Sequence, residues 1–149
     1  LKLLKRKKIK IVFDFNIRPS RWNKKNLNNF LDSVLKFVDI CFLSGEDMNY
    51  WKNKNNIKSY EQIVRKYKLK HSIFRKNAKF TYVFLNKTRY VFKNKLLKTV
   101  VDTSGAGDGF NAAYLSNFIV NNDPVLALKA GSSLGSKIVM KKGAIVDVK

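Results

Sequence analysis

The strongest constraint on the fold is an alternation, near the amino-terminal end, between short apolar runs and a segment with helical periodicity. Residues 8–15 carry a near-continuous apolar run, which is typical of a strand buried inside a parallel sheet. Residues 26–37 have apolar side chains three and four positions apart, which predicts a helix with one buried face. Residues 39–43 form a second apolar run of strand length. The pattern predicts an α/β fold in which helices cover a sheet.

The remaining periodic segments extend this pattern along the chain. A polar Lys/Asn loop is expected at residues 52–58, followed by a helix at residues 59–67. Strands separated by turn-forming pairs then predict a β-meander, at residues 71–75, 80–85 and 89–92. Two further helices are expected, one over residues 110–120 and one that begins at Asp123-Pro124 and runs to a glycine stop at Gly143.

Composition places the chain among globular proteins. With 149 residues, of which 45% are hydrophobic, it can form one domain with a packed core. No apolar run approaches the roughly 18 residues of a membrane span, no signal peptide is expected, and the single cysteine favours a reduced, cytoplasmic setting. Cys41 lies in an apolar run and is expected to be a buried strand thiol. The only histidine, His71, is expected to be exposed or a capping residue rather than catalytic.

The net charge of +21 favours either nucleic-acid binding or a general compositional bias toward lysine. The chain has 25 Lys and only 6 Arg, whereas proteins that read base edges favour Arg. The lysines are also scattered, rather than gathered on one helix among aromatic residues. The sequence therefore disfavours a specific nucleic-acid function, although a basic surface would attract anionic ligands.

The segment most suggestive of chemistry is a glycine-rich turn at residues 101–109. Gly105, Ala106 and Gly107 remove side-chain bulk where a helix would begin, so that backbone N–H groups and the positive end of the helix dipole can hold a phosphate. Asp108 has two interpretations: a first-turn carboxylate that stabilises the helix, or a general base beside an arriving phosphoryl group. The run matches neither a Walker loop nor the dinucleotide G-x-G-x-x-G fingerprint.

Polar side chains follow both predicted parallel strands. Asn16 and Arg18 come after the first strand, at the edge of an open α/β sheet where ligands bind, and Arg is well shaped to hold a carboxylate. The alternative is that Arg18 simply pairs with Asp14. Ser44 and Asp47 follow the second strand, where Ser44 is expected to cap the next helix and Asp47 to lie in its first turn.

Two of these segments resemble proteins of one family. Asp-Thr-Ser-Gly-Ala-Gly-Asp at 102–108 resembles the D-T-x-G-A-G-D signature of the ribokinase-like (PfkB) sugar kinases. The resemblance implies that Asp108 is the catalytic base and that the amides of residues 105–107 form an anion hole for the transferred phosphate. Residues 13–22 are similar to the F-D-x-N-x-R-P-x-L-W run of 2-keto-3-deoxygluconate kinases, with Arg21 at a usually apolar position. By this resemblance Arg18 would contact an acidic sugar and Asn16 would shape its pocket.

The resemblance extends over essentially the whole chain and implies a fold and a reaction. Residues 1–149 would be the carboxyl-terminal half of a kinase about twice as long, an incomplete ribokinase-like three-layer α/β sandwich. The implied reaction transfers a phosphate from ATP to a primary hydroxyl of an acidic keto-sugar, with Mg²⁺ as cofactor. The resemblance also implies a monovalent cation near Asp102 and Ser104. Ser44 and Asp47 stand where the family has the Asn and the Glu of its N-x-x-E motif, and Asp47 would act on Mg²⁺ through water. The last helix would wall the adenine site, and the chain near Gly143 would return to the glycine-rich turn.

Two departures qualify what the resemblance implies. Residues 74–79 lack both glycines of the family's K-x-G-x-x-G nucleotide loop, which argues against tight ATP binding. Without the amino-terminal half and its lid, the chain alone is expected to have little or no activity, and to form a homo-oligomer or to pair with the missing half through an exposed sheet edge. No membrane partner is expected. Three alternatives stay open: another PfkB sugar kinase, a non-catalytic remnant, and a basic nucleic-acid-binding module.

Overall fold

The computed structural model describes residues 1–54 and 58–147, and the chain divides into two compact units. The amino-terminal unit is Leu1–Val91 and the carboxyl-terminal unit is Phe92–Lys149. Among the described residues, no helix is both long enough and apolar enough to cross a membrane.

The sheet is mixed, and its strands follow one another in chain order. The strands are β1 (Val12–Asp14), β2 (Ile40–Ser44), β3 (His71–Arg75), β4 (Phe80–Leu85) and β5 (Thr88–Lys93). β1, β2 and β3 are parallel neighbours, with Phe13 opposite Cys41 and Cys41 opposite Ser72. β4 then returns antiparallel to β3. The parallel strands therefore end at one edge, where the sequence placed its candidate ligand-binding side chains.

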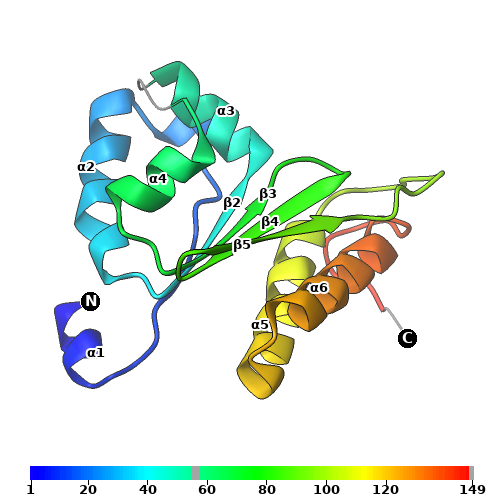
Figure 1. The fold of residues 1–149 in the computed structure, drawn as a ribbon. Helices are drawn as coiled ribbons and strands as arrows, with labels where there is room; N and C mark the ends of the chain where they lie inside the picture. Colours follow the sequence, from blue (N-terminus) through cyan, green and yellow to red (C-terminus); the bar gives the residue numbers. More distant parts are fainter. Residues whose placement is uncertain (55–57, 148–149) are drawn as a thin grey trace. The chain divides into compact units, whose positions relative to one another are not determined.

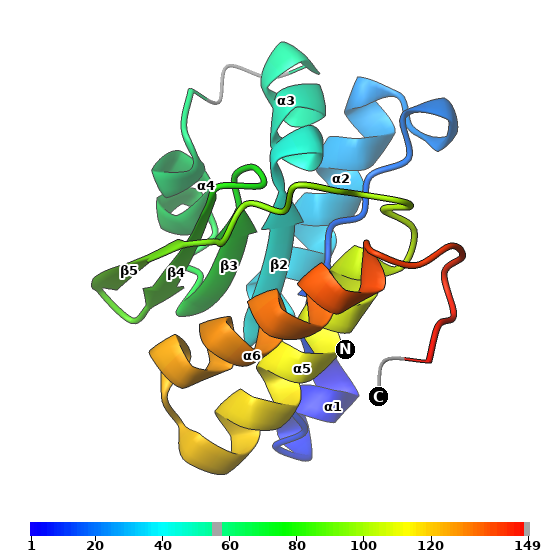
Figure 2. The same cartoon turned by 90° about the vertical axis from the view of Figure 1, so that its right-hand side faces the viewer.

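Helices of the amino-terminal unit cover one face of this sheet. Figures 1 and 2 show α2 (Lys24–Val34), α3 (Gly45–Lys54) and α4 (Tyr60–Lys66) together on that face. The leucines of the predicted helical stripe are its core, with Leu27, Leu31 and the following Leu35 almost fully buried. Among the described residues, this unit also has three shorter helices: α1 (Lys2–Arg6), η1 (Pro19–Arg21) and η2 (Leu35–Phe37).

The carboxyl-terminal unit is built on a pair of helices that lie side by side (Figure 2), α5 (Ala106–Asn121) and α6 (Pro124–Ile138). The carboxylate of Asp123 caps α6 by accepting hydrogen bonds from the amides of Val125 and Leu126 at 2.7 and 3.1 Å. The two helices approach closely at Gly131, where an added Cβ would lie 3.0 Å from the ring of Phe110. The expected Pro at the first turn of α6 is confirmed.

Most predicted elements are confirmed, including the β-meander, and the buried thiol of Cys41 is as expected. The first strand is shorter than predicted. The amide of Ile11 donates to the carboxylate of Asp39 at 2.8 Å, so that a side chain takes the place of a strand partner before Val12. The predicted loop at 52–58 was partly wrong, because α3 continues to Lys54; residues 55–57 lie outside the described residues.

Two further predictions were wrong. The last helix ends at Ile138 rather than at Gly143, because the carbonyl of Val139 accepts the amides of Val101 and Asp102 from another segment. His71 is buried rather than exposed, and burial lowers its pKa to about 4. The histidine is therefore a neutral core residue at physiological pH.

Candidate active site

The glycine-rich turn forms the amino-terminal end of α5. Gly105 is the N-cap residue and adopts a left-handed conformation with φ 72° and ψ −9°, which glycine tolerates best. A Cβ at this position would also overlap the carbonyl oxygen of Ala144. Ala106, Gly107 and Asp108 follow as the first residues of the helix, and the side chain of Asp108 is exposed. The sequence prediction of a glycine turn that opens a helix is confirmed.

The carboxylate of Asp102 links this turn to the segment that follows α6 through hydrogen bonds. One of its carboxylate oxygens accepts the amide of Ser104 at 2.8 Å, and the other accepts the amide of Gly143 at 2.9 Å. The hydrogen bonds from Ser104 and Gly143 lower the pKa of Asp102, so its carboxylate stays ionised. The expected return of the chain near Gly143 to the glycine-rich turn is thereby confirmed.

The start of α5 has the electrostatics of an anion site. The helix has 16 residues, and the aligned peptide dipoles concentrate positive potential at its first turn. The amide of Ala106 makes a long hydrogen bond of 3.3 Å to the carbonyl of Thr103. Asp108 carries a negative charge into the same turn. An anionic ligand here would have to approach beside a carboxylate, an arrangement suited to transferring a proton from a hydroxyl next to a phosphate.

In the amino-terminal unit, the segment after β1 presents the other predicted residues. Asn16 and Arg18 are exposed, whereas Phe15 and Ile17, which alternate with them, are buried. Asn16 has a positive φ of 36°, a conformation that Asn adopts more readily than most residues. The sequence left open a pairing of Arg18 with Asp14, but the carboxylate of Asp14 lies 3.9 Å from the guanidinium of Arg75 on β3.

Ser44 and Asp47 cap α3 reciprocally, as the sequence predicted for Ser44. The hydroxyl of Ser44 accepts the amide of Asp47 at 3.0 Å, and the Asp47 carboxylate accepts both the amide and the hydroxyl of Ser44, at 2.9 and 2.6 Å. The second carboxylate oxygen of Asp47 accepts the amide of Ile17 at 2.6 Å. Asp47 is buried, with only 5% of its surface exposed. The structure thus brings Asp47 together with the segment that carries Asn16 and Arg18.

The same segment has a second attachment to α3. The hydroxyl of Tyr50 donates to the carbonyl of Trp22 at 2.8 Å, on the far side of η1. The Ser-x-x-Asp spacing could have revealed the reciprocal cap, but the contacts of α3 with Ile17 and Trp22 join residues about 30 positions apart and leave no local signal in the sequence. Sequence reasoning therefore missed α3 as the support of the Arg18 segment.

In the turn between β3 and β4, an asparagine side chain closes the backbone where the expected nucleotide loop would have glycines. The side-chain carbonyl of Asn77 accepts the amides of Lys79 and Phe80, at 3.0 and 2.9 Å, and the amide of Lys76 donates to the carbonyl of Phe80 at 3.0 Å. Asn is a residue that favours such side-chain-closed turns. The carbonyl of Lys76 lies so close to Gly45 that an added Cβ there would overlap it.

A preformed metal centre is not present in the part of the chain that the structure describes. No group of three or more His, Cys, Asp or Glu side chains in residues 1–54 and 58–147 could hold a metal ion together. The carboxylate of Asp47 is already occupied by three protein donors. Asp47 is therefore suited to contact a metal ion through water rather than as a direct ligand.

Comparison with characterised proteins shows similarity to sugar kinases along the whole chain. The chain is 28% identical over 151 residues to a 2-dehydro-3-deoxygluconokinase of Haemophilus influenzae, with 99% of this chain and 48% of that protein covered. It is 27% identical to a 5-dehydro-2-deoxygluconokinase of Bacillus licheniformis, with 95% and 44% covered. The chain therefore spans about half the length of the curated relatives it matches.

Solved structures confirm the fold. An Escherichia coli protein provisionally named ribokinase II matches with a TM-score of 0.85, 20% identity and coverage of 99% of this chain and 48% of its own. That protein has also been solved in complex with ATP and Mg²⁺. A fructokinase double mutant of Vibrio cholerae with fructose, ADP and a potassium ion matches with a TM-score of 0.81 and 21% identity, over 96% of this chain and 48% of its own.

The α/β fold with its five-stranded mixed sheet is thus that of the ribokinase-like proteins, over about half of their length. The family model described as pfkB family carbohydrate kinase matches residues 1–149. The glycine-rich turn at the start of α5 and the polar segment after β1 lie where the sequence motifs predicted them. This chain belongs to the pfkB family of carbohydrate kinases.

Proposed function

We propose that this chain supplies the catalytic base and the phosphate-binding turn of an ATP-dependent kinase for an acidic keto-sugar. The substrate would be 2-keto-3-deoxygluconate, also called 2-dehydro-3-deoxygluconate, or a sugar acid of the same class. The relatives named for 2-dehydro-3-deoxygluconate and 5-dehydro-2-deoxygluconate support that class. Residues 1–149 would be the carboxyl-terminal part of the kinase domain.

The observation that carries the proposal is the position of Asp108. It lies in the first turn of α5, directly after a turn whose backbone requires glycine at Gly105. An exposed carboxylate at this place can accept a proton from a bound hydroxyl, while the helix start attracts the phosphate that the hydroxyl attacks. A carboxylate that only stabilised the helix would not need the glycine-rich turn before it.

In the proposed reaction, Asp108 takes the proton of a primary hydroxyl as its oxygen attacks the γ-phosphorus of ATP. A bond forms between that oxygen and phosphorus, the bond from phosphorus to the β–γ bridging oxygen breaks, and ADP leaves. The amides of residues 105–107 would stabilise the charge that develops on the transferred phosphate. When bound, Mg²⁺ would neutralise phosphate charge. Asp47 would act on it through water.

Arg18 and Asn16 would bind the sugar. The guanidinium of Arg18 is exposed at the carboxyl end of β1 and can hold a carboxylate through two hydrogen bonds. Asn16 would shape the pocket beside it. Asp47 and Tyr50 on α3 hold this segment in place through the contacts to Ile17 and Trp22. A monovalent cation would lie near Asp102 and Ser104, whose turn is anchored by the Asp102 carboxylate.

The base assignment is tested by Asp108→Asn, with Glu46→Gln as the matched control because Glu46 is also an exposed carboxylate in the first turn of a helix. ADP release with 2-dehydro-3-deoxygluconate is measured for this chain and for versions that continue upstream of Leu1. Asp108→Asn should lower kcat by about 10²–10⁴-fold in whichever version is active, without weakening ATP binding more than about twofold. Equal rates for Asp108→Asn and the parent would eliminate Asp108 as the base.

The substrate class is tested by Arg18→Gln, with Arg21→Gln as the control on the same segment. Because Arg18 would pair with the sugar carboxylate, its loss should raise KM for the sugar acid at least about tenfold and leave KM for a neutral sugar such as fructose or ribose unchanged. A similar rise with acidic and neutral sugars would assign Arg18 to the fold rather than to specificity.

A further inference from the structure

The segment that presents Arg18 is a short turn with a defined backbone. Arg18 is the N-cap residue of η1, and the amide of Arg21 donates to its carbonyl at 2.9 Å. Pro19, at the first position of η1, has a φ that its ring restricts. Although Arg18 and Arg21 are both exposed, the backbone between Arg18 and Trp22 is therefore already shaped before any ligand binds.

Both ends of this turn are held by one face of α3. The carboxylate of Asp47 accepts the amide of Ile17 at 2.6 Å, just before the turn. The hydroxyl of Tyr50 lies 2.8 Å from the carbonyl of Trp22 and 3.5 Å from that of Pro19. Because a phenol has one proton to donate, the shorter contact is the main hydrogen bond. Asp47 and Tyr50 are three positions apart, so that they lie on the same side of the helix.

The two contacts have different consequences for Arg18. An attachment at Ile17 alone would leave the turn able to pivot about that point, and the second attachment at Trp22 fixes its direction. The ring of Trp22 packs against Phe30 of α2, with centroids 5.1 Å apart, so α2 holds the side chain while α3 holds the carbonyl. The hydroxyl of Tyr50 therefore sets where the backbone of the turn points.

Arginine depends strongly on such support. Its long side chain has many rotamers, and two parallel hydrogen bonds to a carboxylate form only when the guanidinium is correctly placed. Within residues 1–54 and 58–147, no ion pair holds the guanidinium of Arg18, so its placement relies on the backbone. A misplacement of about 1 Å would be enough to weaken the bound state.

We infer that Tyr50 is a positioning residue for substrate specificity: its hydroxyl orients the turn so that Arg18 can hold the carboxylate of the sugar acid. The inference rests on the proposed role of Arg18. It adds a determinant that lies on another element and does not touch the sugar. Tyr50 should therefore affect acidic sugars through Arg18 and neutral sugars hardly at all.

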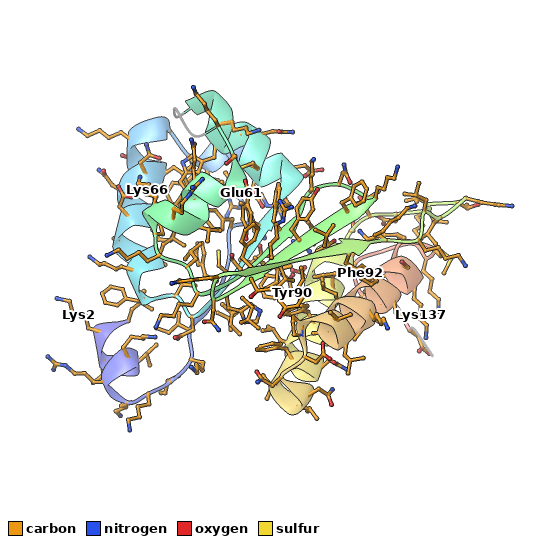
Figure 3. All side chains as sticks on the ribbon, in the orientation of Figure 1. Lys2, Glu61, Lys66, Tyr90, Phe92 and Lys137 are labelled. Atoms are coloured by element: carbon orange, nitrogen blue, oxygen red, sulfur yellow. The ribbon has the colours of Figure 1, made fainter. Side chains whose placement is uncertain are left out.

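The test is Tyr50→Phe, which removes the hydroxyl and keeps the ring. In the version of the chain that is active, KM for 2-dehydro-3-deoxygluconate should rise about fivefold, as expected for one lost hydrogen bond. The kcat value and KM for fructose should each change less than about twofold. The matched control is Tyr67→Phe, next to Lys66 of α4 (Figure 3), whose hydroxyl donates to Asp32 at 2.7 Å away from the turn. It should change KM for neither sugar.

A double-mutant cycle with Arg18→Gln separates positioning from a general structural role. In the Arg18→Gln background, Tyr50→Phe should change KM for the sugar acid less than about twofold, since the group that it positions is gone. A persistent rise in that background, or an equal rise for fructose, would overturn the inference. So would an unchanged KM in Tyr50→Phe when Arg18→Gln raises it, and the proposed function would then stand. No effect of Arg18→Gln itself would overturn both.

Backbone NMR of this chain tests the physical premise without turnover. The amide order parameters of Ser20 and Arg21 should be near the rigid value of about 0.85 and fall toward about 0.6 in Tyr50→Phe, but not in Tyr67→Phe. Values that stay rigid in Tyr50→Phe would overturn the inference. If no version turns over, calorimetric binding of the sugar acid replaces KM in the cycle, and absence of binding in every version would overturn the proposed function and the inference together.

Discussion

One buried carboxylate, Asp47, illustrates how a residue-scale contact supports the candidate site. It accepts hydrogen bonds from the amide of Ile17 and from both the amide and the hydroxyl of Ser44. The family resemblance suggested a role near Mg²⁺, and that role stays a prediction. What the structure adds is a tie between the start of α3 and the segment that presents Arg18.

We expect Asp47→Asn to lower the free energy of unfolding by about 2 kcal/mol, because an amide nitrogen would face backbone donors in a buried position. The matched control is Asp32→Asn, whose exposed carboxylate contacts Tyr67 and Lys66. It should cost less than about 1 kcal/mol. Urea denaturation of the three proteins measures both values. A smaller loss for Asp47→Asn than for Asp32→Asn would mean that the tie contributes little to stability.

The buried His71 predicts a pH dependence of stability. Its pKa is about 4 in the folded chain and near 6.5 when unfolded, so the unfolded state binds the proton first as the pH falls. Stability should be unaffected above pH 7, decrease by roughly 3 kcal/mol between pH 6.5 and 4, and level off with respect to this group below pH 4. Urea denaturation across this range measures the slope. His71→Phe should remove most of it; an unchanged slope would assign it to other groups.

At the scale of helices and strands, the sequence correctly predicted the type and the order of most elements. The stripe of Leu27, Leu31 and Leu35 repeats at intervals that only a one-sided helix explains, and its burial follows from that. Helix and strand ends were predicted less well. β1 begins late because Asp39 takes the amide of Ile11, and α6 ends early because Val139 accepts amides from residues 101 and 102. Such ends depend on partners distant in the chain.

Two glycines with positive φ, Gly105 at the start of α5 and Gly143 after α6, should differ in how much a substitution by alanine lowers stability. Gly105 (φ 72°) faces the Ala144 carbonyl, whereas Gly143 (φ 98°) has open space where a Cβ would be. Gly143→Ala should therefore cost only the backbone strain, about 1–2 kcal/mol. Gly105→Ala should cost at least about 1 kcal/mol more, because the turn must also move away from Ala144. Thermal unfolding of both variants checks the order, and a reversed order would contradict the described turn.

At the scale of the whole molecule, the charge of +21 is the dominant property. The ion pairs formed by Lys66 with Asp32 and by Arg89 with Glu61 are largely exposed, and such pairs contribute little. Repulsion among the unmatched cations should therefore outweigh them. Raising NaCl from 0.05 to 0.5 M should increase the thermal midpoint, since salt screens this repulsion. A falling midpoint, measured by circular dichroism with chloride held as the only anion, would show that the ion pairs dominate instead.

The amino-acid sequence alone determined the family and the fold class. The 102–108 motif, the Asn16–Arg18 segment and the alternation of apolar runs are local patterns, and they predicted the family, the α/β class and the helix that begins after Gly105. Only the tertiary structure decided how the local pieces are held. Asp102 joins the glycine-rich turn to Gly143, Asp47 joins α3 to Ile17, and His71 is buried. The physical reason is that hydrogen bonds and burial depend on which groups are close in space. A contact between residues 30 or 40 positions apart produces no local periodicity in the sequence from which it could be predicted.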